Sequence, residues 1–157
     1  MITTTDNKFY LSKEGLTKAK QEYNKLLEFK KSKTKGEVPA ILHSEDVNPE
    51  YITFQEDLSI LDARLAEYEN ILKNSEIIKS PSKEKRGEIC LGAKIVCEVG
   101  GERDEFVIVG SLESNPSLGK ISNVSPVGST LLGHKAGDIV TVNSSIKVTY
   151  KVLKISY

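Results

Sequence analysis

Two long segments in the first half of the chain carry apolar residues at alternating steps of three and four. This spacing places one apolar stripe along a helix. The first repeat begins after Ser12, a favourable N-cap, and fades before Gly36, which opposes further helix. It predicts a first helix over about residues 12–34, with a stripe of Leu16, Ala19, Tyr23, Leu26 and Lys30.

The second segment repeats the same steps without interruption. It begins at Asn48-Pro49, a typical N-cap followed by a typical first helical residue. It predicts a second helix over about residues 49–75. Because so narrow a stripe favours packing against one partner helix, we predict an antiparallel coiled-coil hairpin. The second stripe consists of Tyr51, Phe54, Leu58, Leu61, Leu65, Tyr68 and Leu72.

The connection between the two predicted helices, about residues 35–48, contains two adjacent acids, Glu45 and Asp46. A hairpin of helices on the order of 40 Å long has a thin core and projects from the rest of its fold. We therefore expect the two acids at the tip of a long arm. The alternative interpretation is an ordinary solvated polar loop.

The pattern changes in the second half of the chain. Proline, serines and mixed charge at residues 77–88 are typical of a linker. A turn is predicted at Gly100-Gly101 with residues 102–105, and a short helix at residues 125–133 with Ser125 as N-cap. Alternating or short apolar runs predict strands within residues 93–99, 106–109, 121–124, 138–142 and 146–157.

Together these elements predict an α+β fold in three parts. They are a coiled-coil hairpin domain at residues 1–76, the linker at 77–88, and an antiparallel β-sheet domain with a short helix at 89–157.

Charge and composition narrow the classes of function. The 22 basic and 22 acidic residues cancel, which argues against binding to nucleic acids or membrane surfaces through bulk charge. No apolar run reaches membrane-spanning length, and the first residues lack the apolar core of a secretory signal. Cys90 and Cys97 are predicted to face opposite sides of one strand, so they cannot pair there. We expect reduced thiols and a cytoplasmic protein.

The balanced charge is unevenly distributed. Residues 8–35 contain nine lysines and three acids, whereas residues 37–69 contain nine acids and one arginine. Two solvated helix faces that attract each other across the hairpin would explain this division, and so would an interaction surface.

The order of these parts resembles the bacterial GreA/GreB transcript-cleavage factors. The family's opening helix is similar to YLSKEGLTKAKQEYNKLL, and its returning helix is similar to NPEYITFQEDLSILDARLAEYENILKNSEII. The most specific stretch of the family signature is similar to GKISNVSPVGSTLLGHKAGDIVTV. The resemblance covers nearly the whole chain and implies that the second domain is FKBP-like.

The resemblance also implies a mechanism. The second domain would dock on RNA polymerase at the rim of its secondary channel, and the hairpin would enter the channel. The acidic tip would help to hold a second Mg²⁺ in the polymerase active site, where backtracked nascent RNA is cleaved. We therefore expect a monomer that is not an enzyme, has no cofactor of its own and shares Mg²⁺ with the polymerase. Its partners would be RNA polymerase and nascent RNA, with no membrane contact and no metal held stably by the free protein.

Three groups of residues take candidate roles from the resemblance. Glu45 and Asp46 are expected to assist the polymerase Mg²⁺, and Ser125 with Pro126 to dock on the polymerase. The lysines that match the family's RNA-contact patch are Lys30, Lys31, Lys33 and Lys35. The lysines also suit a solvated helix end, and Ser125-Pro126 also suits a purely structural helix cap.

The tip departs from the family pattern, Gly-Asp-Leu-x-Glu-Asn-Ala-Glu-Tyr. An ungapped alignment puts the family's functional Asp on Ser44 and its functional Glu on Val47, with Glu45 and Asp46 between them. Either these two acids replace the usual pair and cleavage is stimulated, which we expect, or the tip occupies the channel without supporting cleavage. The second case describes an inhibitor or competitor of cleavage factors. A third interpretation is that channel function has been lost.

Two rival functions come from other classes. An FKBP-like domain suggests prolyl isomerisation, but that activity needs an aromatic-lined pocket. The aromatic residues of the domain are only Phe106, Tyr150 and Tyr157. A coiled-coil adapter would bind the polymerase without touching its active site. The two histidines and two cysteines show no zinc-ligand spacing.

Overall fold

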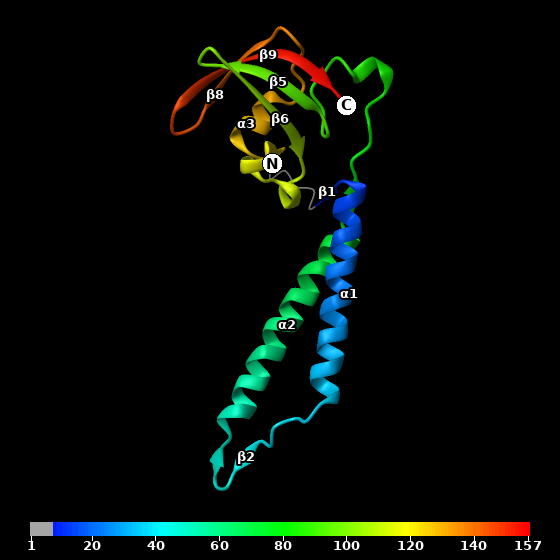
Figure 1. Cartoon of the computed structure of the whole chain (residues 1–157), viewed down its shortest axis with the longest axis vertical. Helices are drawn as coiled ribbons and strands as arrows, with labels where there is room; N and C mark the ends of the chain where they lie inside the picture. Colours follow the sequence, from blue (N-terminus) through cyan, green and yellow to red (C-terminus); the bar gives the residue numbers. More distant parts are fainter. Residues whose placement is uncertain (1–7) are drawn as a thin grey trace, which may run out of the picture. The chain divides into compact units, whose positions relative to one another are not determined.

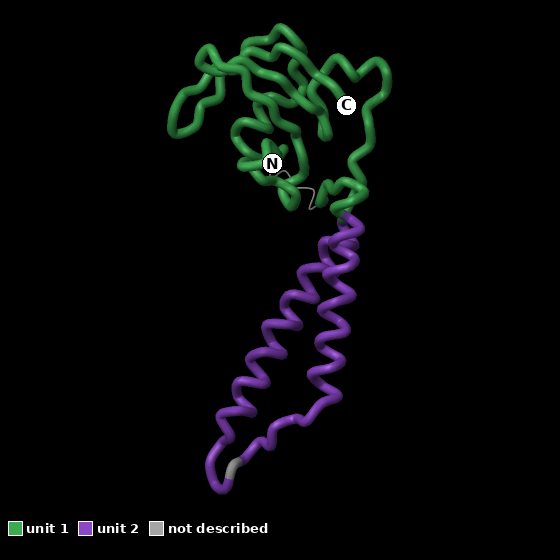
Figure 2. Tube along the Cα trace, in the orientation of Figure 1, with its two compact units in different colours: residues 1–15, 75–157 green, residues 16–74 purple. Residues whose placement is uncertain are grey.

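The computed structural model describes residues 8–157, apart from the side chain of His43. These residues form two compact units (Figure 2). The hairpin unit consists of residues 16–74, and the sheet unit consists of residues up to 15 together with residues 75–157. Among the described residues, no helix is long and apolar enough to cross a membrane. The predicted boundaries at residues 76 and 88 stay a prediction.

The hairpin unit is built from two helices, α1 (Lys13–Lys35) and α2 (Pro49–Lys73). All twelve predicted stripe positions are buried or half-buried. In α2 every other position is exposed except Ile71. The predicted stripes are therefore confirmed, and they mark the surfaces through which the helices face each other.

Side-chain contacts fix the antiparallel direction of the two helices. The Tyr23 hydroxyl donates to the Glu69 carboxylate at 2.8 Å near the base, and Lys30 forms an ion pair with Asp62 further along. As residue numbers rise on α1 they fall on α2. Figure 1 shows the two helices separating toward the tip. Charged side chains therefore bridge the part of the hairpin where apolar contact is weakest.

The sheet unit contains a five-stranded sheet in the order β7-β6-β5-β9-β8. Its strands are β5 (Lys94–Val99), β6 (Glu102–Val109), β7 (Lys120–Ser122), β8 (Ile139–Asn143) and β9 (Lys147–Ser156). The short helix α3 (Pro126–Leu131) follows β7. A separate pair joins β1 (Phe9–Leu11) in parallel to β4 (Ser75–Ile77). Single 3₁₀ turns are η1 (Lys83–Lys85), η2 (Ser111–Glu113) and η3 (Pro116–Leu118).

The α+β fold is confirmed, with four corrections. The sheet is mixed, because β6 and β7 pair in parallel. Residues 102–105 belong to β6, since Gly100 and Gly101 complete the turn with φ of 59° and 84°. The predicted linker region contains η1, and its first residue, Ile77, is the last residue of β4. Cys90 precedes β5, so the two cysteines do not share a strand.

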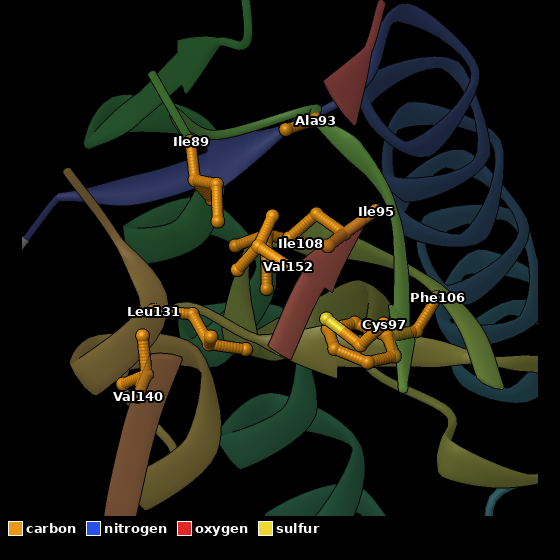
Figure 3. Close-up of a cluster of buried hydrophobic side chains, with 9 residues drawn as sticks. All are labelled: Ile89, Ala93, Ile95, Cys97, Phe106, Ile108, Leu131, Val140 and Val152. Atoms are coloured by element: carbon orange, nitrogen blue, oxygen red, sulfur yellow. The ribbon is translucent and has the colours of Figure 1, made fainter. Parts of the chain in front are cut away.

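The core of the sheet unit is a cluster of buried apolar side chains (Figure 3). Both cysteines are free thiols, and Cys97 lies inside this core. Burial raises the pKa of the Cys97 thiol to about 11, so this thiol stays protonated and unreactive near neutral pH. The cluster consists of Ile89, Ala93, Ile95, Cys97, Phe106, Ile108, Leu131, Val140 and Val152.

The first turn of α1 is fixed by a carboxylate from far along the chain. The Ser12 amide and hydroxyl each donate to a different oxygen of Glu113 at 2.6 Å. The Ser12 hydroxyl oxygen also accepts from the Gly15 amide at 2.9 Å, which confirms Ser12 as the N-cap. A negative charge at this helix end is favoured by the helix dipole.

We predict that Glu113→Ala lowers the free energy of unfolding by about 1–2 kcal/mol, because it removes two charge-assisted hydrogen bonds. Urea unfolding followed by circular dichroism measures this loss. Glu102→Ala, at an exposed position of β6, is the matched control and should change stability by no more than about 0.5 kcal/mol. Equal effects of the two substitutions would contradict the role of Glu113.

Candidate functional site

The far end of the hairpin unit is a miniature β-hairpin. Strand β2 (Leu42–His43) pairs antiparallel with β3 (Asp46–Val47). The two residues between them, Ser44 and Glu45, form the turn. Ser44 has a φ of 63°, as expected for the first residue of a tight hairpin turn. The acidic pair therefore lies in a defined β-hairpin, with Glu45 in its turn and Asp46 at the start of β3.

Asn48 ties this turn to the start of α2. Its side-chain oxygen accepts from the Glu50 amide at 3.0 Å, which confirms the predicted N-cap. Its side-chain nitrogen donates to the Ala40 carbonyl at 2.9 Å, and its backbone amide donates to the Ile41 carbonyl at 3.0 Å. Among the described residues Asn48 is the only buried polar side chain. Asn48 thus ties the segment that leads into β2 to the first turn of α2.

The carboxylates of Glu45 and Asp46 are exposed. No described side chain forms an ion pair with either of them, and residues 36–63 contain seven acids and no lysine or arginine. Adjacent carboxylates without a basic neighbour attract cations. Their oxygens are hard ligands of the kind that Mg²⁺ prefers. Within the described part of the chain, no three potential ligands gather into a metal site.

Asp138 in the sheet unit is an acid that, unlike Glu45 and Asp46, has partners within its own fold. Asp138 accepts from the Lys135 amide at 2.9 Å and lies 3.2 Å from Nδ1 of His134. The amide hydrogen bond and the neighbouring imidazole lower the pKa of Asp138. This carboxylate is already satisfied by its own fold, whereas Glu45 and Asp46 are directed at solvent.

The four lysines of the predicted RNA-contact patch do not share one environment. Lys30 and Lys33 are half-buried and form ion pairs with Asp62 and Asp57 of α2. The Lys33 ammonium also lies 5.9 Å from the centre of the Phe54 ring. The two remaining lysines, Lys31 and Lys35, are exposed. The structure therefore turns half of the predicted patch toward the partner helix.

The Ser125-Pro126 stretch forms the start of α3, as predicted. The Ser125 hydroxyl accepts from the Gly128 amide at 3.1 Å and donates to the Ser122 carbonyl at 2.7 Å. Its polar group is consequently used within the fold. Pro126 and its neighbour Val124 are exposed. The accessible part of this stretch is thus apolar, and Val124 was not singled out from the sequence.

We predict that Asn48→Ala lowers the free energy of unfolding by about 2 kcal/mol, because it removes both the cap and the hydrogen bond to Ala40. Asn48→Ser keeps a capping oxygen and loses the hydrogen bond to Ala40, so its cost should be about 1 kcal/mol. Urea unfolding compares the two variants. Limited proteolysis should cut within residues 36–47 faster in both than in the parent. Unchanged cutting would show that Asn48 does not hold the tip.

Comparison with known proteins gives one consistent result. The family described as "Transcription elongation factor, GreA/GreB, C-term" matches residues 83–157. "Transcription elongation factor GreA" of Thermomicrobium roseum is 34% identical over 136 residues, which cover 85% of this chain and 87% of that protein. The protein of the same name from Clostridium acetobutylicum is 35% identical over 155 residues, covering 96% and 98%. The crystal structure of GreA factor homolog 1 from Thermus thermophilus covers 96% of this chain and 99% of its own, with 26% identity and a TM-score of 0.42.

Proposed function

This chain belongs to the GreA/GreB family of transcription elongation factors, and we propose that it binds RNA polymerase and presents the acidic turn of its hairpin to the polymerase active site. In this proposal the sheet unit docks on the polymerase and the hairpin enters the secondary channel. The protein is then a factor that completes another enzyme's site, and its effect is on the cleavage of backtracked nascent RNA.

The observation that carries the proposal is the environment of Glu45 and Asp46. Both carboxylates lie in or next to a two-residue turn that Asn48 holds against α2, and both are exposed. α2 has 25 residues, which at about 1.5 Å each makes an arm about 37 Å long. An acidic turn on such an arm can reach a recessed site that a globular surface cannot enter.

The donor set fits a shared Mg²⁺. Mg²⁺ is commonly held by one or two protein carboxylates together with waters and substrate phosphates, and Glu45 and Asp46 supply two such groups. When bound there, a second Mg²⁺ would polarise a water and stabilise the charge that develops on the phosphate. The task of this chain is to place the two carboxylates, and it does so through the turn geometry and the Asn48 hydrogen bonds.

A second candidate function is occupation of the channel without support of cleavage. The family carries its functional acids at two positions of the tip. In this chain those positions are occupied by Ser44 and Val47, which favours the second candidate. Ser44 is a turn residue in the left-handed region, and Val47 is an exposed strand residue. Neither can ligate Mg²⁺ through a carboxylate. A protein with this tip that bound RNA polymerase as tightly as a cleavage factor does would compete with such factors.

The double variant Glu45→Gln, Asp46→Asn tests the working acids. It removes two charges and keeps side-chain size, so stability should change by no more than about 0.5 kcal/mol. We expect polymerase binding to persist and the effect on RNA cleavage to vanish. The measurement is the length of RNA in a stalled, backtracked polymerase complex with Mg²⁺, resolved on a gel with and without the factor.

The matched control is Glu37→Gln, Glu50→Gln, which removes the same charge from the same end of the hairpin. It should leave the effect on cleavage unchanged. The sign of the parent's effect separates the two candidates, since stimulation supports active-site completion and inhibition supports occupation. If the Glu45, Asp46 variant acts as the parent does, the acids are only solvated turn residues.

We also propose that the surface around Ser125 and Pro126 docks on the polymerase. Since the Ser125 hydroxyl caps α3, the contact would be made by its apolar neighbours Val124 and Pro126. We predict that Val124→Glu with Pro126→Glu weakens polymerase binding at least tenfold without unfolding the protein, because a buried unpaired carboxylate is costly. A pull-down titration measures the affinity.

Ser125→Ala is the control for a purely structural role. It should cost about 1 kcal/mol of stability as a lost cap but leave binding nearly unchanged. If the glutamate variant binds as tightly as the parent, the docking surface lies elsewhere.

The RNA-contact role falls in this proposal to Lys31 and Lys35, because Lys30 and Lys33 form ion pairs with α2.

A further inference from the structure

Exposed apolar side chains gather at the tip of the hairpin. Of the thirteen large hydrophobic residues that are exposed in the described chain, five lie between residues 38 and 52. Concentrations of exposed apolar surface usually mark sites of interaction. The five residues are Val38, Ile41, Leu42, Val47 and Ile52.

The turn presents two different faces. Leu42 and Val47 are directly opposite each other in the β2–β3 ladder, so their side chains share one face. Asp46 follows the alternation of a strand and lies on the other face. Leu42 is 57% exposed and Val47 is 54% exposed, so among the described residues more than half of each is open to solvent. We call Leu42 and Val47 the apolar face of the turn.

Charge excludes nucleic acid as the partner of this face. Residues 36–63 contain seven acids and no lysine or arginine, which repels phosphates. None of the five exposed apolar residues is aromatic, so none offers the stacking surface by which single-stranded RNA is usually bound. The same acids oppose the approach of a second copy of this tip. What remains is an apolar protein surface that lies beside bound cations.

We propose that the apolar face of the turn packs on an apolar protein surface of RNA polymerase next to its catalytic cations. This inference rests on the proposed function and adds a partner surface to it. With Leu42 and Val47 seated on protein, the opposite face of the turn points Asp46 at the cations, and Glu45 lies at the edge between them. Apolar contact thus supplies affinity, and the acids supply chemistry.

The test is the double variant Leu42→Thr, Val47→Thr. Threonine keeps the strand preference of both positions and replaces apolar surface by a hydroxyl. We expect polymerase affinity to fall roughly tenfold or more, as for the loss of a few buried methyl groups. The effect on RNA cleavage should fall at low factor concentration and return at saturation, because both acids remain. Ile146→Thr is the matched control, since Ile146 is 72% exposed in the sheet unit.

The parent is measured first, by binding titration and by cleavage in the backtracked complex. If the parent neither binds the polymerase nor changes RNA cleavage, the proposed function is wrong, and so is this inference. If the parent binds the polymerase and changes RNA cleavage, and the Leu42, Val47 variant binds as tightly as the parent, this inference alone is overturned. An equal loss for Ile146→Thr would overturn it as well. So would sedimentation showing that the parent self-associates and that the variant does not, since the apolar face would then belong to a second copy.

Discussion

Asn48 is the only polar residue that is buried in the described chain. The position of the acidic turn depends on the hydrogen bonds of its side chain. A buried amide is costly unless its groups are paired, and here both its oxygen and its nitrogen have partners. One partner, the Glu50 amide, belongs to α2, and the other, the Ala40 carbonyl, lies in the segment that leads into β2. The result is a turn that is fixed to the end of the helix, although only two residues form each of its strands.

The packing between α1 and α2 explains why the tip needs the hydrogen bonds of Asn48. Near the base the two helices share apolar stripes, but toward the tip the stripe of α1 continues through Lys30 and Lys33, which reach acids of α2. Surface ion pairs between a half-buried lysine and an exposed aspartate contribute little stability, typically about 0–1 kcal/mol each. The outer half of the arm therefore has little packing of its own. Its order comes from local hydrogen bonds at the turn, which leaves the apolar surface of the tip free for a partner.

Much of this arrangement could be predicted from the sequence because it depends on local signals. The stripes, the caps at Ser12, Asn48 and Ser125, and the placement of Glu45 and Asp46 between two helices all follow from spacing. Long-range pairing could not be predicted in the same way. Three-residue strands such as β1 and β4 are too short to show a period, and the contact of Glu113 with Ser12 spans 101 positions. The lysines were ambiguous, because a lysine in a stripe position suits either solvent or an acid on the partner helix.

Local radical mapping measures most directly whether the acidic turn lies at the polymerase cations, as we propose. Fe²⁺ can replace Mg²⁺ in the active site of a backtracked polymerase, and with peroxide it generates hydroxyl radicals that cut only nearby backbone. With this chain labelled at one end and bound to that complex, we expect cuts within residues 42–47 and none in the sheet unit. Binding without cuts at the turn, or cuts concentrated in the sheet unit, would contradict the claim.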